Sequence, residues 1–521
     1  MTAARPNLLR AAASVGGLTM VSRLLGFIRD ILIARFLGAG MAADAFFVAF
    51  KLPNFFRRLF AEGAFSAAFV PLFAAAHETS PTEAKRFAQD VLAALLAVLL
   101  LFTGLMEMLM PWLVLAITGG FKGAEPEKLA LAVELTRLTF PFLMLISLVA
   151  LLAGILNSLG RFAAAAAAPI LLNLCLIAAA LLGRESPALT ATTLATAVSV
   201  AGLLQFAGLL YAVRRAGIQL RLAWPRFTPR VRELLRVAWP AAIGAGAMQI
   251  NLLVDTVLAT RFLPEGSLSY LYYGDRLNQL PIGVIGVAVG TVLLPTLSRQ
   301  IASSAPEVAN HSQNRAMELA LFFALPAAAA LIALADSLIR VLFERGAFDA
   351  AATRATAQAL AAYALGLPAY VLVKVLTPGF YARKDTATPV RYAMIAVAVN
   401  SVLGVVLMLW LAHVGLALAT ALAAWLNAGL LYLGLTRRGH FHLDVKMRAN
   451  GLKMLLAAGV MTAALLALAG LLGGWLQGGG GWAILALALL VMTGLAVYAG
   501  AAWATGALRL AALRRQLRGG A

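Results

Sequence analysis

The sequence predicts an all-α polytopic membrane protein, and three observations support this fold class. Hydrophobic residues make up 62% of the 521 residues and charged residues only 12%, whereas soluble domains average about 25% charged residues. Apolar runs long enough to cross a bilayer recur along the whole chain. Lys and Arg gather in the segments between alternate runs. Each run is expected to be a helix, because an open sheet would leave backbone groups unpaired in lipid.

Fourteen runs are the predicted spans, since each holds about 20 or more mostly apolar residues. A glycine-rich turn, LLGGWLQGGGGW at 471–482, separates the last two of them. The predicted spans are 12–37, 43–75, 87–117, 129–157, 163–183, 188–213, 232–262, 267–298, 314–337, 355–381, 388–411, 415–435, 450–474 and 480–507.

The basic residues predict how these spans are oriented. If the N-terminus is cytoplasmic, the predicted cytoplasmic segments hold 26 of the 42 Lys and Arg, and the opposite side holds about seven. This is the positive-inside bias of membrane proteins, and it puts both termini in the cytoplasm. It also accounts for the formal net charge of +20 without a nucleic-acid partner.

An internal repeat predicts the domain organisation. RFLGAG at 35–40 recurs as RFLPEG at 261–266, and each precedes a span with charges near its middle. The offset equals six spans, so two six-helix lobes of the same orientation are expected, with a substrate site between them. The linker is basic and is expected to lie on an anionic membrane surface. The predicted domains are the N-terminal lobe 1–216, the cytoplasmic linker 217–231, the C-terminal lobe 232–437, and two extra helices with a basic tail, 438–521.

Nine basic residues fall inside predicted spans. A central Arg or Lys costs about 2.5–3.5 kcal/mol on insertion scales, so these side chains must face protein, an acidic partner or water. The nine are Arg23, Arg29, Arg35, Lys51, Arg57, Arg58, Arg137, Arg276 and Lys374.

Residue spacing suggests partners for some of these charges. Arg23 and Asp30 are seven residues apart on one helix face, and Arg58 and Glu62 are i,i+4 neighbours. Pro53 disturbs the second span, because proline removes a helix hydrogen bond. Structural or interfacial roles are expected for Arg35, Arg58, Arg137 and Lys374. Structural ion pairs are expected at Asp30, Arg58, Glu62 and Asp275.

The remaining arginines predict an anion site. Basic residues outnumber acidic residues in the first two spans, and arginine binds phosphate oxygens through two parallel hydrogen bonds. A phosphate-bearing ligand is therefore expected in a water-filled cavity. The residues predicted to line it are Arg23, Arg29, Arg57 and Arg276.

Two aspartates are candidates for an ion-coupling site, because Na⁺ prefers oxygen ligands. Asp255 lies in the seventh span, and its role stays open between coupling and structure. Asp385 precedes the eleventh span, where capping of the following helix and pairing with Lys384 is the favoured interpretation. No cofactor is predicted, and coupling to Na⁺, H⁺ or the membrane potential is left open.

Three stretches carry a resemblance to a known family. They are SRLLGFIRDILIARFLGAGMAADAFFVAFKLPNFFRRLFAEGAFSAAFVP at 22–71, YYGDRLNQLPIGVIGVAVGTVLLPTLS at 272–298 and VKVLTPGFYARKDTATPV at 373–390. The first resembles the N-terminal signature of the MurJ (MviN) family, and the other two are similar to further stretches of it. These proteins are lipid II flippases of the multidrug/oligosaccharidyl-lipid/polysaccharide exporter superfamily. The resemblance covers the whole chain.

The resemblance implies a function in peptidoglycan biosynthesis. Lipid II, an undecaprenyl-diphosphate-linked disaccharide-pentapeptide, would be moved from the cytoplasmic to the periplasmic leaflet of the bacterial inner membrane by alternating access. Helices 13 and 14 would hold its polyprenyl tail. The family's arginines match Arg23, Arg29, Arg57 and Arg276, and its second-helix acid matches Asp44. Lys51 and Arg57 are placed toward the cavity.

Two positions depart from some members of the family. Gln279 stands where some members have Glu, which argues against a charged role there. Asp255 and Asp385 resemble acids that bind Na⁺ in some members, but Tyr381 replaces a smaller amide side chain and weakens the sodium interpretation. The expected partners are lipid II, membrane lipids and the cell-wall synthesis machinery, and the chain is expected to act as a monomer.

Other function classes fit less well. A flippase for another polyprenyl-linked polysaccharide, or a multidrug exporter, is the nearest alternative, although an exporter of cations should line its cavity with acids. A membrane-embedded transferase needs an acid or His cluster at one membrane face, and the five histidines are scattered near predicted loops. A scaffold without transport would not need unmatched cations inside its spans.

Overall fold

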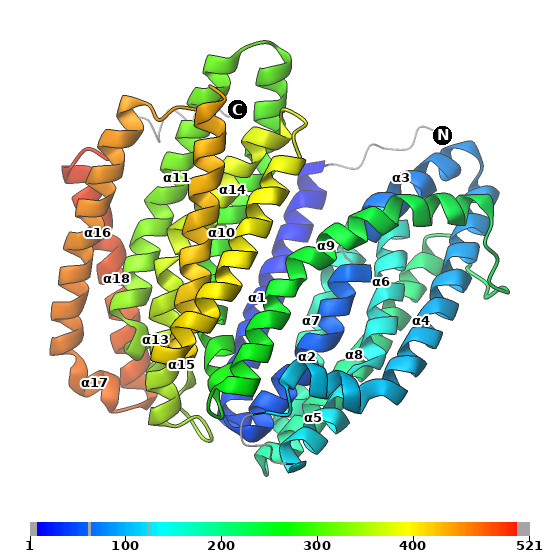
Figure 1. The fold of residues 1–521 in the computed structure, drawn as a ribbon, viewed down its shortest axis with the longest axis horizontal. Helices are drawn as coiled ribbons and strands as arrows, with labels where there is room; N and C mark the ends of the chain where they lie inside the picture. Colours follow the sequence, from blue (N-terminus) through cyan, green and yellow to red (C-terminus); the bar gives the residue numbers. More distant parts are fainter. Residues whose placement is uncertain (1–7, 61–63, 122–125, 508–521) are drawn as a thin grey trace. The chain divides into compact units, whose positions relative to one another are not determined.

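The computed structural model describes residues 8–60, 64–121 and 126–507 (Figure 1). Every regular element in these ranges is a helix. The helices group by their contacts into two compact units, which are described separately. The first unit contains α1 (Leu8–Leu37), α2 (Met41–Phe60), α3 (Ala64–Thr79), α4 (Pro81–Thr118), α5 (Pro126–Thr139), α6 (Pro141–Ser158), α7 (Phe162–Leu182), α8 (Pro187–Arg215) and α9 (Pro229–Phe262).

The second unit begins at Tyr270, just inside α10. A short segment, Arg345–Phe348, belongs to the first unit by its contacts. The helices of the second unit are α10 (Ser267–Ala302), α11 (Pro306–Ala333), α12 (Ala335–Phe343), α13 (Ala350–Leu365), α14 (Leu367–Tyr381), α15 (Ala387–Arg437), α16 (Val445–Leu471), α17 (Gly473–Gln477) and α18 (Gly480–Ala504).

The helices confirm the predicted fold class of a helical membrane protein. Nine helical stretches among the described residues are long and apolar enough to cross a membrane. Two of these stretches join consecutive helices, α5 with α6 and α13 with α14. Helices α1, α2, α9 and α10, which carry most of the predicted intramembrane charges, are not among the nine. The count of fourteen crossings therefore stays a prediction.

The longest helix, α15, is a hairpin of two helices. Ala412 interrupts it with φ 49° and ψ −129°, between the predicted spans 388–411 and 415–435. Beyond the break the chain runs back along itself, because Gly434 lies against Tyr392 and Arg438 donates to Thr388 at 3.1 Å. The two predicted spans are thus two separate helices, joined by a turn of only a few residues.

Local sequence signals explain where several helices of the first unit begin. A Ser or Thr followed by Pro precedes α4, α8 and α9, and Ser80, Ser186 and Thr228 each accept a bond from the backbone N–H three residues on. These residues satisfy a donor that the first turn cannot pair, and proline suits the first helical position. Helix α9 packs against α2, α3 and α4.

The lobe boundary predicted at 231–232 rests on the internal repeat. The division of the helices into two units by their contacts does not test a repeat symmetry, so this boundary stays a prediction.

The two repeated segments each end one helix and lead into the next. RFLGAG ends α1 and leads into α2, and RFLPEG ends α9 and leads into α10. Each turn contains a glycine with positive φ, Gly38 at 72° and Gly266 at 85°, but these are the fourth residue of one segment and the sixth of the other. The internal repeat therefore stays a prediction.

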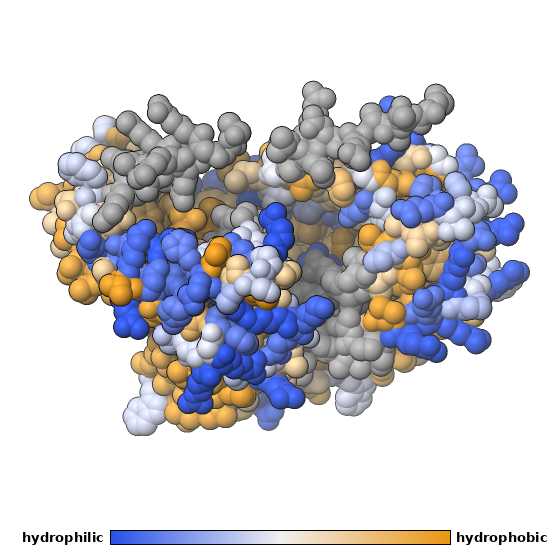
Figure 2. Space-filling model, turned by 90° about the horizontal axis from the view of Figure 1, so that it is seen from above, coloured by the Kyte–Doolittle hydropathy of each residue, from blue (hydrophilic) through white to orange (hydrophobic). Residues whose placement is uncertain are grey.

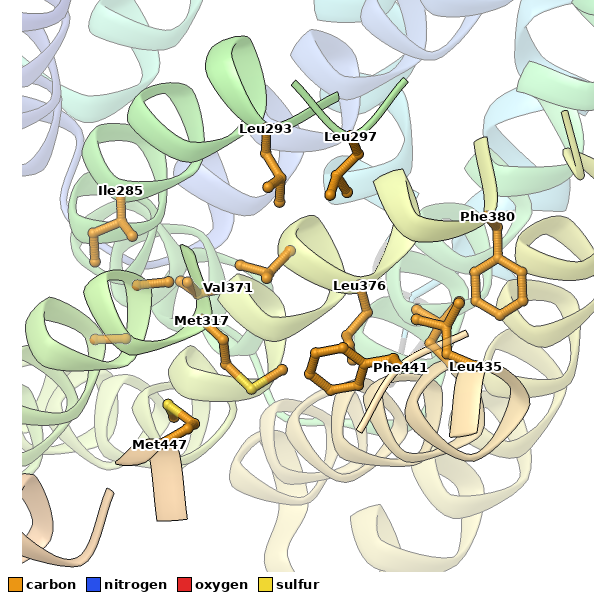
Figure 3. Packing of buried hydrophobic residues seen from close by; sticks show 14 of the residues in the cluster. Ile285, Leu293, Leu297, Met317, Val371, Leu376, Phe380, Leu435, Phe441 and Met447 are labelled. Atoms are coloured by element: carbon orange, nitrogen blue, oxygen red, sulfur yellow. The ribbon is translucent and has the colours of Figure 1, made fainter. Parts of the chain in front are cut away.

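A hydrophobic cluster holds the second unit together (Figure 3). Ile285, Leu293 and Leu297 of α10 face side chains of α11, α14 and α15, with Phe441 closing the cluster from the loop before α16. A second cluster joins α12 to α16 and α18. The Tyr498 hydroxyl of α18 donates to the Phe322 carbonyl of α11 at 2.8 Å, so the last two long helices are bound to this unit by both apolar and polar contacts.

Large apolar side chains also cover the outside of the helices. Met108 and Trp112 of α4 are 78% and 72% exposed, and Trp410 of α15 is 84% exposed. Soluble proteins rarely expose contiguous apolar surface of this kind. On the face shown in Figure 2, hydrophilic residues gather in patches, and hydrophobic residues lie between and around them. The chain is a multi-pass membrane protein whose apolar sides face lipid.

The turn of the α15 hairpin gives a stability prediction. A Cβ on Gly415 would lie 2.4 Å from the Leu407 carbonyl, so Gly415→Ala should destabilise the protein by about 1–3 kcal/mol through overpacking. Gly429→Ala is the matched control on the same helix, because a Cβ there meets nothing within 4 Å. It should be neutral or stabilising by up to about 1 kcal/mol. Thermal unfolding in detergent measures both, and equal shifts would show that the turn tolerates a Cβ.

Candidate functional site

Arg29 and Asp30 form a buried ion pair on α1. The Arg29 Nη2 and Nε atoms lie 2.7 and 2.9 Å from Asp30 Oδ1, and only 6% and 1% of the two residues is exposed. Arg29 Nη1 also donates to Asn173 Oδ1 of α7 at 3.0 Å. The predicted structural role of Asp30 agrees with this geometry, but the basic partner seen is its neighbour Arg29. Arg23, the partner suggested by the spacing of seven, lies exposed on α1.

The described residues engage only part of the Arg29 guanidinium. Arginine has five N–H donors, and the described residues engage three of them, two with Asp30 and one with Asn173. Asn173 is itself fixed, because its Nδ2 donates to the Ser22 carbonyl at 2.8 Å. The guanidinium is therefore positioned by α1 and α7 before any ligand arrives.

Asp44 of α2 is buried at the first turn of α10. Its Oδ2 accepts from the Gly266 N–H at 2.8 Å, and its Oδ1 accepts from the Ser269 N–H at 3.1 Å. Lys128 Nζ lies 3.3 Å from Oδ2. The start of a helix has unpaired N–H groups and a partial positive charge, both of which a carboxylate stabilises. This geometry favours a structural role for Asp44, and its predicted contact with substrate stays a prediction.

Pro53 breaks the hydrogen bonding of α2 near the predicted cavity residues. Because proline has no N–H, the Ala49 carbonyl one turn earlier loses its helix partner. The Thr139 hydroxyl of α5 donates to that carbonyl at 2.8 Å, and Asn54 Nδ2 donates to the Phe50 carbonyl at 2.8 Å. Side chains thus replace the lost backbone bond. The sequence indicated the break but gave no signal that Thr139 would repair it.

Lys51 and Arg57 flank this break, and both are half-buried. Lys51 Nζ lies 3.5 Å from the Thr256 hydroxyl of α9, next to Asp255, which is also half-buried. The predicted Arg58–Glu62 pair lies outside the described residues, since Glu62 falls within 61–63 and the Arg58 side chain is not described. Arg57, Lys51 and Asp255 therefore remain candidates for binding or coupling.

Asp275, Arg276 and Gln279 occupy one stretch of α10 in the second unit. Asp275 and Arg276 are half-buried. The Gln279 Nε2 donates to Asp275 Oδ2 one helical turn away. An amide can donate this bond and a carboxylate cannot, so Gln279 suits the carboxylate beside it better than a glutamate would. Arg276 is positioned next to this pair.

Asp385 precedes Thr386, the N-cap residue of α15, and its side chain bonds the first turn of that helix. Its Oδ1 accepts from the Thr388 N–H at 3.0 Å, as predicted, but its basic partner is Arg438 at 2.6 Å and not Lys384. The bonds from Thr388 and then from Arg438 lower the pKa of Asp385 to about 2. These contacts support the favoured structural interpretation. Among the described residues no group of three His, Cys, Asp or Glu is arranged to hold a metal ion.

The Asp385–Arg438 pair gives a pH-dependent prediction. Asp385→Asn keeps an oxygen that can cap α15 but removes the charge, so it should destabilise the protein at pH 7. The folded pKa of about 2 lies below the ordinary value of 3.8 for an aspartate, so the stabilisation is present above pH 4 and is lost as the pH falls from about 4 toward 2. Thermal unfolding of both proteins should therefore differ at pH 7 and converge near pH 2–3.

Asp349→Asn is the matched control for this prediction. Asp349 caps α13 by accepting from the Ala352 N–H at 2.7 Å, and no ion pair to it is found within the described part of the chain. Its substitution should cost less than that of Asp385 at pH 7. Equal costs would mean that Arg438 contributes nothing to stability.

Comparisons with known proteins agree with one family. The family model described as "Lipid II flippase MurJ" matches residues 33–491. A protein of Rhizobium tropici named "Probable lipid II flippase MurJ" is 46% identical, over 98% of this chain and 97% of that protein. A "Lipid II flippase MurJ" of Burkholderia cenocepacia is 37% identical over 83% of this chain and 84% of its own length.

Solved structures give the same result. "Lipid II flippase MurJ, inward closed conformation" matches with a TM-score of 0.77 and 28% identity, covering 94% of this chain and 97% of that one. An inward-facing multidrug resistance transporter of the MATE family matches with a TM-score of 0.65 at 16% identity, over 82% of this chain and 98% of that one. The second likeness shows the fold alone. Together with the family model, the relatives show that the chain belongs to the lipid II flippase MurJ family.

Proposed function

We infer that this protein is a lipid II flippase, a transporter that supplies the precursor for peptidoglycan synthesis. The observation that carries this function is the family match over residues 33–491, with 46% identity to a relative along nearly the whole of both chains. The substrate has a diphosphate and sugars that cannot cross hydrocarbon unaided. Fixed cations in a hydrated cavity would replace the water around the diphosphate.

Cavity arginines would bind the diphosphate. Arg29 supports this role, because two of its five donors are not engaged by the described residues while Asp30 and Asn173 hold it in place. Lys51 and Arg57 would contribute from the broken part of α2, and Arg23 and Arg276 complete the predicted set. Asp44 would act indirectly, by fixing the first turn of α10.

The protein would work as a monomer in the bacterial inner membrane, with both termini cytoplasmic. The bias of Lys and Arg toward the predicted cytoplasmic segments supports this orientation. Lipid II would enter from the cytoplasmic leaflet and leave to the periplasmic one as the two lobes alternate between inward and outward access. The polyprenyl tail would lie along α16 and α18, and cell-wall synthesis proteins would receive the product.

The function is tested in cells depleted of their own lipid II flippase. Lipid II that reaches the outer leaflet is labelled with a periplasmic probe, after expression of the wild type, Arg276→Ala or Arg299→Ala. Arg299 is the matched control, because it lies in the last turn of the same helix. The wild type and Arg299→Ala should restore labelling, and Arg276→Ala should reduce it at least tenfold. If the wild type reaches the membrane without restoring it, another polyprenyl-linked glycan becomes the substrate.

The same assay separates binding from folding at Arg29. Arg29→Met alone leaves Asp30 charged and buried, which costs about 3–5 kcal/mol. Arg29→Met/Asp30→Asn removes both charges, so its thermal stability should recover. Transport should stay lost in the double variant if the guanidinium binds the diphosphate. Recovery of both stability and transport would make Arg29 a purely structural residue.

The membrane potential is the proposed driving force for the anionic cargo. A potential that is negative inside favours outward movement of negative charge, by about 2.3 kcal/mol per charge per 100 mV. Labelling of lipid II should fall when an ionophore collapses the potential at constant pH and sodium. Unchanged labelling would exclude this driving force. If sodium removal instead lowers labelling in cells with the wild type but not in cells with an Asp255→Asn variant, the coupling is assigned to Na⁺.

A further inference from the structure

A cavity of about 430 Å³ lies in the first unit, away from the predicted transport residues. It is formed where α1 begins, where α6 turns into α7, and where α8 ends. Ser14, Arg161, Tyr211 and Arg215 are among its lining residues. Ser14 and Tyr211 lie near the ends of predicted spans, and Arg161 and Arg215 lie in the segments just beyond such ends, where lipid headgroups meet water.

Two helix ends fix the backbone of the cavity arginines. Helix α6 ends with Gly160 at φ 71°, and the Arg161 N–H bonds the Leu156 carbonyl at 2.8 Å. Helix α8 ends in the same way, with Gly217 at φ 91° and the Ile218 N–H bonded to the Val213 carbonyl at 3.2 Å. Both are Schellman motifs, which need a residue with positive φ, usually glycine. Arg161 and Arg215 are thus held at defined places on two neighbouring turns.

Arg161 and Arg215, both exposed, give the cavity a positive charge. Arg161 Nη1 lies 3.4 Å from the Arg215 carbonyl, and no acidic side chain in the described part of the chain forms an ion pair with either arginine. The first residues of α7, Phe162 and Ala163, also line the cavity, and no side chain caps that helix. Unpaired N–H groups and the helix dipole add to the attraction for an anion.

A groove continues from this cavity along α1 and α7. A second cavity, of about 330 Å³, shares Phe162 with the first and lies between α1 and α7. Val15, Ala165, Ala166 and Pro169 provide most of its apolar wall. The Thr19 hydroxyl in this groove donates to the Val15 carbonyl of its own helix at 2.8 Å. The two cavities together offer a cationic end and an apolar channel.

We propose that these joined cavities bind an anionic phospholipid, with its phosphate on Arg161 and Arg215 and an acyl chain between α1 and α7. Basic pockets between transmembrane helices on the cytoplasmic side bind anionic headgroups in this way. The apolar groove favours a lipid over free phosphate, because a free ion would leave it without an occupant. The site goes beyond the proposed transport function and shares no residue with the predicted diphosphate site.

The test uses the delipidated full-length protein in detergent. Native mass spectrometry measures the affinity for dioleoyl phosphatidylglycerol and for dioleoyl phosphatidylcholine. The wild type should prefer phosphatidylglycerol, and Arg161→Gln/Arg215→Gln should lose about tenfold in that affinity, equivalent to 1.4 kcal/mol. The control Arg184→Gln/Arg214→Gln removes the same charge from exposed arginines that do not line the cavity. It should keep the wild-type affinity for phosphatidylglycerol. Equal losses in the two double variants would overturn the site, as would equal binding of the two lipids.

A second variant tests the groove and does not depend on the arginines. Ala166→Trp should fill the space between α1 and α7, and so weaken dioleoyl phosphatidylglycerol about tenfold while leaving the short-chain dihexanoyl lipid unchanged. Inorganic phosphate is the remaining probe. If it displaces phosphatidylglycerol at millimolar concentration, and chain length has no effect on wild-type affinity, the cavity is a free-phosphate site and the lipid proposal fails. These measurements need no transport assay. A negative result for the lipid site therefore leaves the proposed flippase function untouched.

Discussion

A charge inside a membrane protein has no bulk water to stabilise it, and the packing of the first unit depends on this constraint. Arg29 is neutralised by the adjacent Asp30 and fixed by Asn173 from α7. Asp44 is neutralised by Lys128 and by the N–H groups that begin α10. Each of these two sets of contacts joins one helix to another that is distant in sequence. The contacts that make the charges tolerable are therefore also contacts that hold the helices in place.

The same constraint shapes what the arginines can do as ligands for an anion. A guanidinium that is already paired is held in one conformation, so the side chain loses little conformational entropy when a substrate binds. Its planar fork still presents donors on the side away from the carboxylate. In the proposed diphosphate site, a partly neutralised cation would hold the diphosphate less tightly than a bare one. This would favour transport, because the cargo must be released on the far side as readily as it is bound.

Much of the fold follows from the sequence, because hydropathy and proline, serine and glycine signals act locally. The start of α8 at Ser186–Pro187 and the division of α15 near 412 are examples. Partners were harder to predict, since they come from other helices: Asn173 beside Arg29, Lys128 beside Asp44 and Arg438 beside Asp385. Closeness in sequence suggested Arg23 for Asp30 and Lys384 for Asp385, but both aspartates have partners from elsewhere or from another neighbour: Arg29 for Asp30 and Arg438 for Asp385. Thr139, which repairs the break at Pro53, left no signal in its own sequence.

The bonding of Asp44 has a consequence for how the chain assembles during synthesis. Its lysine partner lies 84 residues further on, and its backbone partners at Gly266 and Ser269 lie 222 and 225 residues further on. Helix α2 therefore leaves the ribosome well before any of these groups exists. Lys128 can neutralise the carboxylate first, while several helices are still to be made, and the turn before α10 can only arrive later. Assembly around Asp44 is thus ordered in time, with an early charge pair that keeps a binding position ready for a late helix.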